Sequence, residues 1–406
     1  MRSLFRAPVR SIALLWGLVV FMPVGLNYLC YFALLLALLL SPGRTLRLRR
    51  VRAHLLFWPM ALFLLWTLVV LALQPDWYPE TPTNLWHGGR IALTLAMAIA
   101  LGEEEARWAM RGFVAAAAFS VLVVAVNAAV GLPQWSVWNN LIHYGGNKTV
   151  SNTILMALLA GSALVLALAR GGLVRIAAIG VTLAVLAVLV FALPNRTALL
   201  AVLGAGLVAG VHQLRRARLS LLAFVVAAML ASAAFVTMVP AVQSRLALGF
   251  SEIREANSGE VNRDSWNIRV QLVRHTAAMI AERPWMGWGI GAWNAQWRSR
   301  VPPSIADLNM PHDDLLWMGA QAGVPGALSW LAIMLAACLA GWRRQDMAGR
   351  MAFVAALTLL FSALVNSATR DATIGLSLLW VVGLYLRLSA EPGFEPSQLR
   401  LRHAQG

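Results

Sequence analysis

The chain has 406 residues, of which 60% are hydrophobic and 12% are charged, and its mean hydropathy is +0.69. Soluble globular domains carry about 25% charged residues, so this composition excludes a soluble globule and indicates a polytopic membrane protein. The net charge of +16 does not indicate nucleic-acid binding, because the arginines form short clusters between apolar runs, as the positive-inside rule requires. Both cysteines lie inside apolar runs and support neither a disulfide framework nor a thiolate metal site.

The first apolar stretch, residues 11–40, is interrupted around Pro23, Gly25 and Asn27. Arginines flank it at the N-terminus and in residues 44–52. Both flanks are expected in the cytoplasm, so an even number of crossings must separate them. We therefore predict two short helices, the first an uncleaved helix rather than a signal peptide, since no small-x-small cleavage site follows. Ten more spans are predicted, about twelve in all: 54–73, 86–101, 113–130, 152–169, 176–193, 197–211, 219–240, 314–340, 352–366 and 374–388.

The segments between these spans alternate in charge. Those expected in the cytoplasm each contain at least two arginines: 102–112, 170–175, 212–218 and 341–350. The segment 241–311 is far longer and falls on the extracytoplasmic side, and a loop of this length inside a compact protein is usually functional. The pattern predicts an all-α integral membrane protein, a single domain over residues 1–406, with 241–311 as a large outer loop that bears amphipathic helices.

Arg196 and Arg269 are basic residues expected on the outer side. Arg196 lies in a turn so short that its guanidinium must sit at the membrane boundary; it is either a snorkelling arginine or part of an anion site. Arg269 belongs to a predicted helix over 266–283, where helical periodicity places it with Leu272, Val273, Thr276 and Ile280. An arginine in an apolar stripe either pairs with an acid or faces a buried anion.

The opposite face of this helix is expected to be polar. Helical periodicity places Asn267, Gln271, Arg274 and His275 there. Arg274 is therefore predicted to be solvated, in contrast to Arg269.

Residues 309–314 read NMPHDD where the large loop re-enters the membrane. Pro311 suits the first position of a helix, and Asp313 and Asp314 suit its first turn, where carboxylates complement the helix dipole. His312 carries the side chain whose usual pKa lets it accept a proton near neutral pH, so it is either a structural histidine or a general base.

Four weaker candidates have simpler explanations. Lys148, the only lysine, lies in an outer loop and could contact phosphate, although a solvated loop explains it as well. Arg90 lies near the outer end of its span, as boundary anchors do, and Arg370 beside Asp371 is predicted to form a local ion pair. The glycines at 287, 289 and 291 spell GxGxG, but no strand precedes them, so a dinucleotide fold is not expected.

These motifs together resemble the bacterial O-antigen ligase and polymerase superfamily. The matching features are an arginine, three residues and a leucine at Arg196 and Leu200, and a histidine, ten residues, a glycine, two residues and a glycine from His312 to Gly326. Between them, NIRVQLVRHTAAMIAERPWMGWGIG resembles the arginine helix, proline and glycine-rich turn of that superfamily. The family usually has Asn, Ser or Gln after the histidine, where this chain has Asp313.

The resemblance implies a GT-C-like glycosyltransferase of the bacterial inner membrane, with its active site on the periplasmic face. It would move an O-antigen glycan from undecaprenyl diphosphate to a hydroxyl of the lipid A-core oligosaccharide, as an O-antigen ligase does. His312 is then the expected catalytic base, Arg196 and Arg269 the expected diphosphate ligands, and Asp313, Lys148 and Arg90 further candidates. We expect inversion at the anomeric carbon, no cofactor and no metal.

Two alternatives stay open at this point. An O-antigen polymerase would use the same donor with a carrier-linked glycan as acceptor, and a ligase that glycosylates protein is a related possibility. A lipid or glycan transporter belongs to another class; it would carry charged or broken helices at mid-bilayer. The spans here are nearly free of charge at their centres, which favours an enzyme at the interface.

Overall fold

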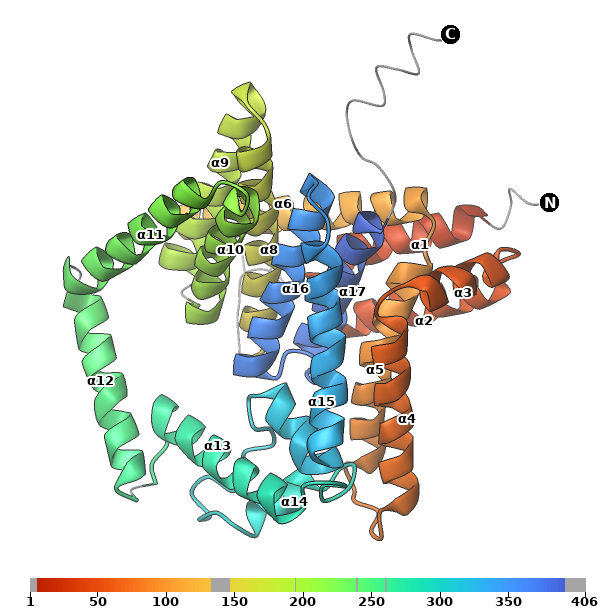
Figure 1. Ribbon diagram of the computed structural model, residues 1–406, viewed down its shortest axis with the longest axis vertical. Helices are drawn as coiled ribbons and strands as arrows, with labels where there is room; N and C mark the ends of the chain where they lie inside the picture. The colour runs from red at the N-terminus through yellow and green to blue at the C-terminus, as the bar shows by residue number, and fades with distance from the viewer. Residues whose placement is uncertain (1–5, 133–146, 194, 239, 260, 391–406) are drawn as a thin grey trace.

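The computed structural model describes residues 6–132, 147–193, 195–238, 240–259 and 261–390, and this part of the chain contains helices and no strands (Figure 1). Chains that lie in lipid satisfy their backbone hydrogen bonds locally, which helices do within one segment. The elements are α1 (Arg6–Val19), α2 (Val24–Leu40), α3 (Arg44–Ala53), α4 (Phe57–Leu73), α5 (Thr81–Ala100), α6 (Glu103–Val130), α8 (Asn147–Ala169), α9 (Gly172–Ala187), the π-helix η1 (Val188–Ala192), α10 (Arg196–Leu214), α11 (Arg218–Met238), α12 (Pro240–Asn257), α13 (Ser265–Glu282), α14 (Trp293–Arg298), α15 (Asp314–Trp342), α16 (Met347–Asn366) and α17 (Ala372–Ser389).

Each of the twelve predicted spans coincides with a helix, which confirms the all-α prediction. These helices are α1, α2, α4, α5, α6, α8, α9, α10, α11, α15, α16 and α17. Within the described residues, seven helices are long and apolar enough to cross a membrane, and an eighth span results if α2 and α3, bent by 110°, count as one. The structure therefore supports a multi-pass membrane protein, while the number of crossings stays a prediction.

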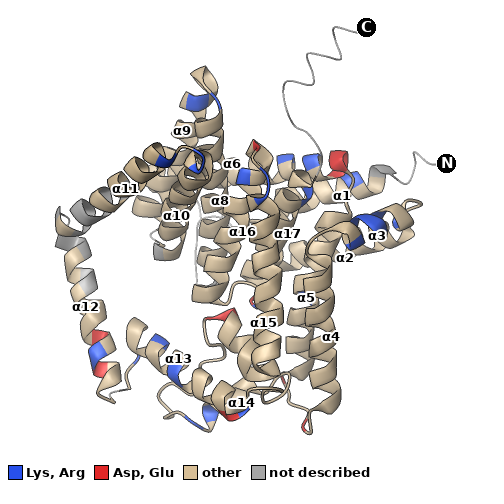
Figure 2. Ribbon diagram, viewed as in Figure 1, with Lys and Arg blue, Asp and Glu red and all other residues tan. Residues whose placement is uncertain are grey.

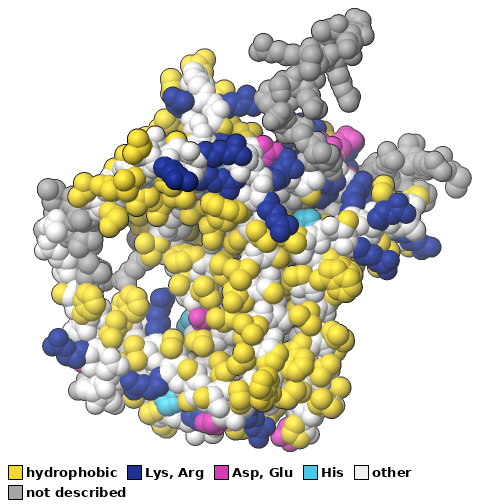
Figure 3. Space-filling model, in the orientation of Figure 1, with side chains coloured by type: hydrophobic (Ala, Val, Ile, Leu, Met, Phe, Trp, Pro, Cys, Tyr) yellow, Lys and Arg dark blue, Asp and Glu magenta, His cyan; other side chains and the backbone are white. Residues whose placement is uncertain are grey.

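Most charged residues lie toward two ends of the molecule, with few between them (Figure 2). At one end they lie on α1, α3, α6, α9 and the start of α11, and at the other on α12, α13 and α14. The space-filling view shows hydrophobic side chains covering much of the face between these ends (Figure 3). This distribution fits a bundle whose middle lies in hydrocarbon.

Helix α17 forms the centre of the bundle. Its span is 83% buried, and it packs against α5, α6, α8 and α16. A helix that is apolar all round is expected at such a position. Small residues permit the closest approach: a Cβ on Gly383 would lie 2.6 Å from the Cβ of Ala98 on α5. Near the other end of the chain, Trp16 of α1 stacks on Trp380 with 4.1 Å between ring centroids.

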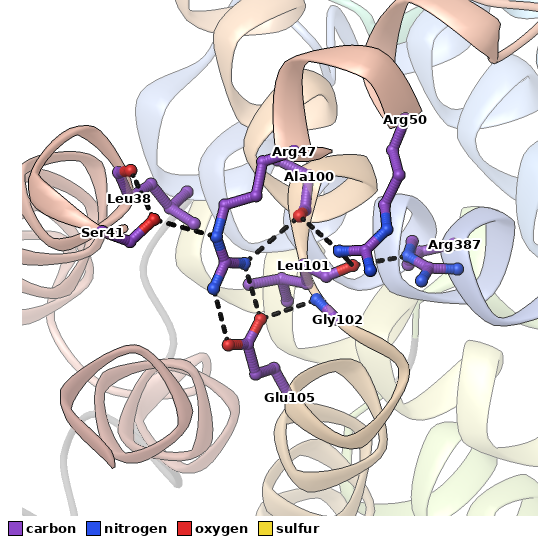
Figure 4. Close-up of polar contacts among 9 residues, drawn as sticks. All are labelled: Leu38, Ser41, Arg47, Arg50, Ala100, Leu101, Gly102, Glu105 and Arg387. Carbon is purple, nitrogen blue, oxygen red and sulfur yellow. Dashed lines mark hydrogen bonds and ion pairs between the residues drawn. The ribbon is translucent and has the colours of Figure 1, made fainter. Parts of the chain in front are cut away.

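A buried cluster of arginines fixes the end of the bundle that lies away from α13 and α14 (Figure 4). Arg47 of α3 holds both carboxylate oxygens of Glu105 at 2.7 Å, and it also donates to the carbonyl of Ala100 at 3.2 Å. Arg387 of α17 donates to the carbonyl of Leu101 at 2.6 Å. Guanidinium groups here satisfy the last carbonyls of α5, which have no partner within the helix.

The opposite end is formed by the segment between α11 and α15. Figure 1 shows α12 standing away from the bundle, with α13 and α14 beneath α15. Helix α13 packs against α12, α14 and α15. The segment is also attached to α5, since the hydroxyl of Thr81 donates to the carbonyl of Ile290 at 2.7 Å. The amphipathic helix predicted over 266–283 is present as α13.

Candidate functional site

The large loop returns to the bundle at the start of α15, where the carboxylates of the NMPHDD stretch lie. Asp313 is the N-cap residue of α15, and its carboxylate accepts a hydrogen bond from the amide of Leu316 at 3.0 Å. This confirms the helix-start interpretation of Asp313. Burial raises the pKa of its carboxyl, although amide hydrogen bonds oppose this rise. The position predicted for Pro311 is wrong: α15 begins at Asp314, and Pro311 is buried before the cap.

His312 immediately precedes the cap and has a left-handed backbone, with φ of 55°. Such a conformation costs a residue other than glycine about 1–3 kcal/mol, and residues of this kind cluster at functional sites. The strain is held in place on both sides, by buried Pro311 and by the capping bond of Asp313. The half-buried imidazole of His312 therefore has a defined position just before the start of α15.

Asp314 joins the start of α15 to the turn between α16 and α17. The residue is fully buried, and its Oδ2 accepts hydrogen bonds from the amide of Thr369 at 2.7 Å and from its hydroxyl at 2.6 Å. The turn, residues 367–371, begins with a second left-handed residue, Ser367, at φ of 49°. The carboxylate predicted to complement the helix dipole thus also makes a long-range contact.

Two guanidinium groups act on the imidazole. Burial lowers the pKa of His312 below its usual value, and the positive charges of Arg269 and Arg370 lower it further. Arg269 reaches the site from α13, where its guanidinium also lies 5.6 Å from the ring centroid of Trp266. The charge of Arg269 therefore acts on His312, although the two residues are 43 positions apart in the sequence. A lowered pKa favours the neutral imidazole, which is the form that can accept a proton, although it makes that imidazole a weaker base.

Arg370 is the functional candidate that sequence reasoning missed. It was expected to pair with Asp371, and the charge of Asp371 does act on it. The Asp371 carboxylate also accepts hydrogen bonds from the amides of Thr373 and Ile374 and caps α17. The guanidinium of Arg370 in addition lies 5.6 Å from the ring centroid of Trp317 on α15. Its place beside His312 depends on the packing of α15 against the turn, which local sequence does not reveal.

Arg196 is the first residue of α10, and its side chain lies outside the described part of the structure. The neighbouring residues show where its helix begins. Asn195 caps α10 by accepting a hydrogen bond from the amide of Ala198 at 3.2 Å. The hydroxyl of Thr197 accepts a hydrogen bond from Asn366, the last residue of α16, at 3.1 Å. The backbone of Arg196 therefore lies next to the turn that carries Arg370.

Arg90 and Lys148 both join helices. Arg90 is fully buried and donates to the Tyr28 hydroxyl at 2.9 Å and to three carbonyls of the turn 367–371. Lys148 donates from Nζ to the carbonyl of Met22 at 2.9 Å, linking the start of α8 to the corner between α1 and α2. These bonds give each residue a structural role, and contact with substrate stays a prediction for both.

The predicted faces of α13 need correction. Asn267 and Gln271, expected on the polar face, are 0% and 2% exposed, whereas Val273, expected on the apolar face, is 49% exposed. The buried arc is rotated because α13 contacts α12, α14 and α15 rather than one flat surface. Arg274 is exposed as predicted, but it also donates to Asn257 at 3.0 Å and so links α13 to α12.

Helix α15 is broken one-third of the way along, and the glycine-rich turn fills the break. Gly323 has φ of 69°, and the carbonyls of Ala320 and Gln321 accept hydrogen bonds from the amides of Trp288 and Gly289 at 2.9 and 3.0 Å. A Cβ on Gly323 would lie 2.3 Å from the carbonyl oxygen of Trp285. The GxGxG motif therefore permits close backbone contact with α15.

Over the described ranges, His, Cys, Asp and Glu form no group of three or more that could hold a metal ion. The acidic pair at the site is engaged: Asp313 caps α15, and Asp314 binds Thr369. Metal-independent chemistry stays a prediction.

Residues 181–331 match the family model described as O-antigen ligase. The matched segment runs from within α9 to within α15 and contains Arg196, Arg269 and His312, whereas Arg370 lies beyond it. No curated protein matches the chain significantly.

Proposed function

We propose that this chain is an O-antigen ligase. The premise is its membership of the O-antigen ligase and polymerase superfamily through residues 181–331. In this proposal the protein transfers a glycan from undecaprenyl diphosphate to a hydroxyl of the lipid A-core oligosaccharide. The observation that carries the proposal is the half-buried imidazole of His312 beside the charges of Arg269 and Arg370. This arrangement combines a base with anion-binding groups at the end of a membrane bundle.

The chemistry is a single displacement. His312 accepts the proton of the acceptor hydroxyl, whose oxygen forms a bond to the anomeric carbon from the face opposite the leaving group. The bond from that carbon to the donor phosphate breaks, and undecaprenyl diphosphate leaves with the electron pair. Arg269, together with Arg196, binds the diphosphate, because guanidinium groups pair with phosphate oxygens and stabilise the charge that grows on them. No metal takes part, and the configuration at the anomeric carbon inverts.

An apolar groove supports a donor with a long hydrocarbon tail. Its volume is about 1220 Å³, and it lies among α8, α9, α10, α11 and α16. Leucines and small residues of α10 line it from Leu200 onward, so it begins about one helical turn from Arg196. A polyprenyl chain in this groove would leave its diphosphate near the start of α10.

The orientation in the membrane follows from the same proposal. The arginine-rich end at α1, α3 and the junction between α10 and α11 would face the cytoplasm, as the positive-inside rule predicts. The 241–311 segment and His312 would then face the periplasm, where the acceptor is presented. We propose the bacterial inner membrane as the location, with about twelve crossings.

Complementation of a strain that lacks its own O-antigen ligase tests the proposal. The wild-type chain should restore polysaccharide attached to lipid A-core, whereas His312→Ala, Arg269→Ala and Arg196→Ala should not. Arg298→Ala, which removes an exposed arginine on α14, is the matched control and should remain active. Arg274→Ala is less suitable as a control because Arg274 links α13 to α12.

Other outcomes would identify the alternatives. Glycan chains that lengthen on the carrier without becoming attached would indicate a polymerase. Attachment to protein would indicate a protein-glycosylating ligase. Movement of lipid-linked glycan across the membrane without any new glycosidic bond would indicate a transporter and refute the proposed reaction.

A further inference from the structure

The turn between α16 and α17, residues 367–371, is held from three sides. Arg90 donates to the carbonyls of residues 369, 370 and 371 at 3.0, 2.6 and 3.1 Å. Asp314 accepts from the amide and hydroxyl of Thr369, and the indole of Trp330 donates to the same hydroxyl at 3.2 Å. Charged hydrogen bonds of this kind restrict the backbone more than neutral ones. The position of any side chain carried by this turn is therefore well defined.

Arg370 is the cationic side chain that the turn carries. It is half-buried, lies over the ring of Trp317, and its Nε has no hydrogen-bond partner among the described residues. The carboxylates of Asp314 and Asp371 attract its charge, and they also accept hydrogen bonds from Thr369 and from the start of α17. A guanidinium partly removed from water is stabilised by an anion that can take several of its five N–H groups. The Nε of Arg370 is therefore available to donate to such an anion.

The turn also lies where the other candidate groups meet. The hydrogen bonds between Asp314 and Thr369 hold the turn against the start of α15, so Arg370 and His312 each lie one or two residues from this contact. The charges of Arg269 and Arg370 also act on His312. The start of α10, which carries Arg196, contacts Asn366 four positions before Arg370. A diphosphate presents two phosphate groups with several charged oxygens. A single guanidinium fork cannot pair with all of these oxygens.

We propose that Arg370 binds the diphosphate of the lipid-linked donor, acting from the α16–α17 turn as Arg269 acts from α13. This inference rests on the proposed function, because it assumes that the anion in the site is a lipid diphosphate. Arg90 and Asp314 then serve as positioning residues, since they fix the turn rather than touch the donor. The proposal adds to the site a residue from outside the segment that matches the O-antigen ligase family.

Direct binding of undecaprenyl diphosphate to the purified full chain tests this role. Arg370→Gln removes the charge and should raise the dissociation constant about tenfold or more, as expected for a lost charge-assisted contact. Arg370→Lys keeps the charge without the fork and should give an intermediate value. Arg298→Ala should bind as the wild type does. Undecaprenol, which lacks phosphate, should not show this dependence on Arg370.

The folding of each variant is checked by thermal denaturation in the same detergent. If Arg370→Gln does not fold, Arg370→Lys decides, and wild-type affinity in that variant would overturn the proposal. If Arg370→Gln folds and binds undecaprenyl diphosphate as tightly as the wild type, the proposal is also wrong. A wild-type chain that does not bind this lipid would overturn it as well.

A transfer assay separates failure of this inference from failure of the proposed function. If the wild type transfers glycan to lipid A-core and Arg370→Gln retains the same KM for the donor, only the role of Arg370 fails. If the wild type binds undecaprenyl diphosphate through Arg370 but transfers no glycan, the binding role stands and the ligase reaction fails.

Discussion

Replacing His312 by glycine separates the chemistry of the imidazole from the strain in its backbone. At φ of 55°, a residue with a Cβ costs roughly 1–2 kcal/mol. Glycine avoids this cost, but the unfolded chain gains conformational freedom worth about 0.5–1 kcal/mol. His312→Gly should therefore be more stable than His312→Ala by on the order of 0.5–1 kcal/mol. Both variants lack the proposed base, so both should lose transfer by about 10²–10⁴-fold.

Two measurements on the purified variants check this reasoning. Chemical denaturation in mixed micelles compares their stabilities, and a transfer assay with undecaprenyl-diphosphate-linked glycan compares their rates. If His312→Ala proves as stable as His312→Gly, the left-handed conformation does not cost what we assign to it. If either variant keeps more than about a tenth of the wild-type rate, His312 is not the general base.

The pH dependence of transfer should show His312 as a base whose activity persists below the usual imidazole pKa of about 6.5. The wild-type rate should fall as His312 gains a proton. Arg269→Gln should raise the pKa of His312, because a positive charge that lowers it is gone; an NMR titration of the imidazole measures this, and an unmoved pKa would contradict this arrangement. Asp314→Ala removes two buried hydrogen bonds and should cost about 3 kcal/mol of unfolding free energy, measured by chemical denaturation; a loss below about 0.5 kcal/mol would mean that the contact is not formed. Gly323→Ala should abolish monodisperse folded protein on size-exclusion chromatography, since its Cβ would overlap a neighbouring carbonyl, whereas Gly180→Ala has open space and should behave as the wild type. EDTA should leave transfer unchanged, and restoration of an EDTA-inhibited rate by magnesium would refute metal independence.

The helical segments could be predicted from the sequence because a membrane restricts the backbone conformations of an apolar run. Each run must satisfy its backbone hydrogen bonds within itself, so each of the twelve predicted spans is a helix. The break around Pro23 and the amphipathic helix α13 were readable for similar local reasons. Whether all twelve helices cross the membrane is not decided by helix formation, because several are short or bent against a neighbour.

Part of the candidate site was also readable from sequence. His312 and Asp313 stand at the boundary between a long loop and an apolar run, where a helix must begin and its first amides need a partner. Arg269 was noticeable because helical periodicity placed it in an apolar stripe, although the buried face of α13 is rotated from the predicted one. These signals are local, since each depends on residues within one or two helical turns.

Tertiary structure alone decided the remaining features. Arg370 looked like half of a local ion pair, but its turn is held at the start of α15 by Asp314, which lies 55 positions before Thr369. The buried arc of α13 and the break at Gly323 likewise depend on contacts with other segments. Helix formation is set by hydrogen bonds between near neighbours, whereas the direction of a side chain is set by whichever distant segment packs against it.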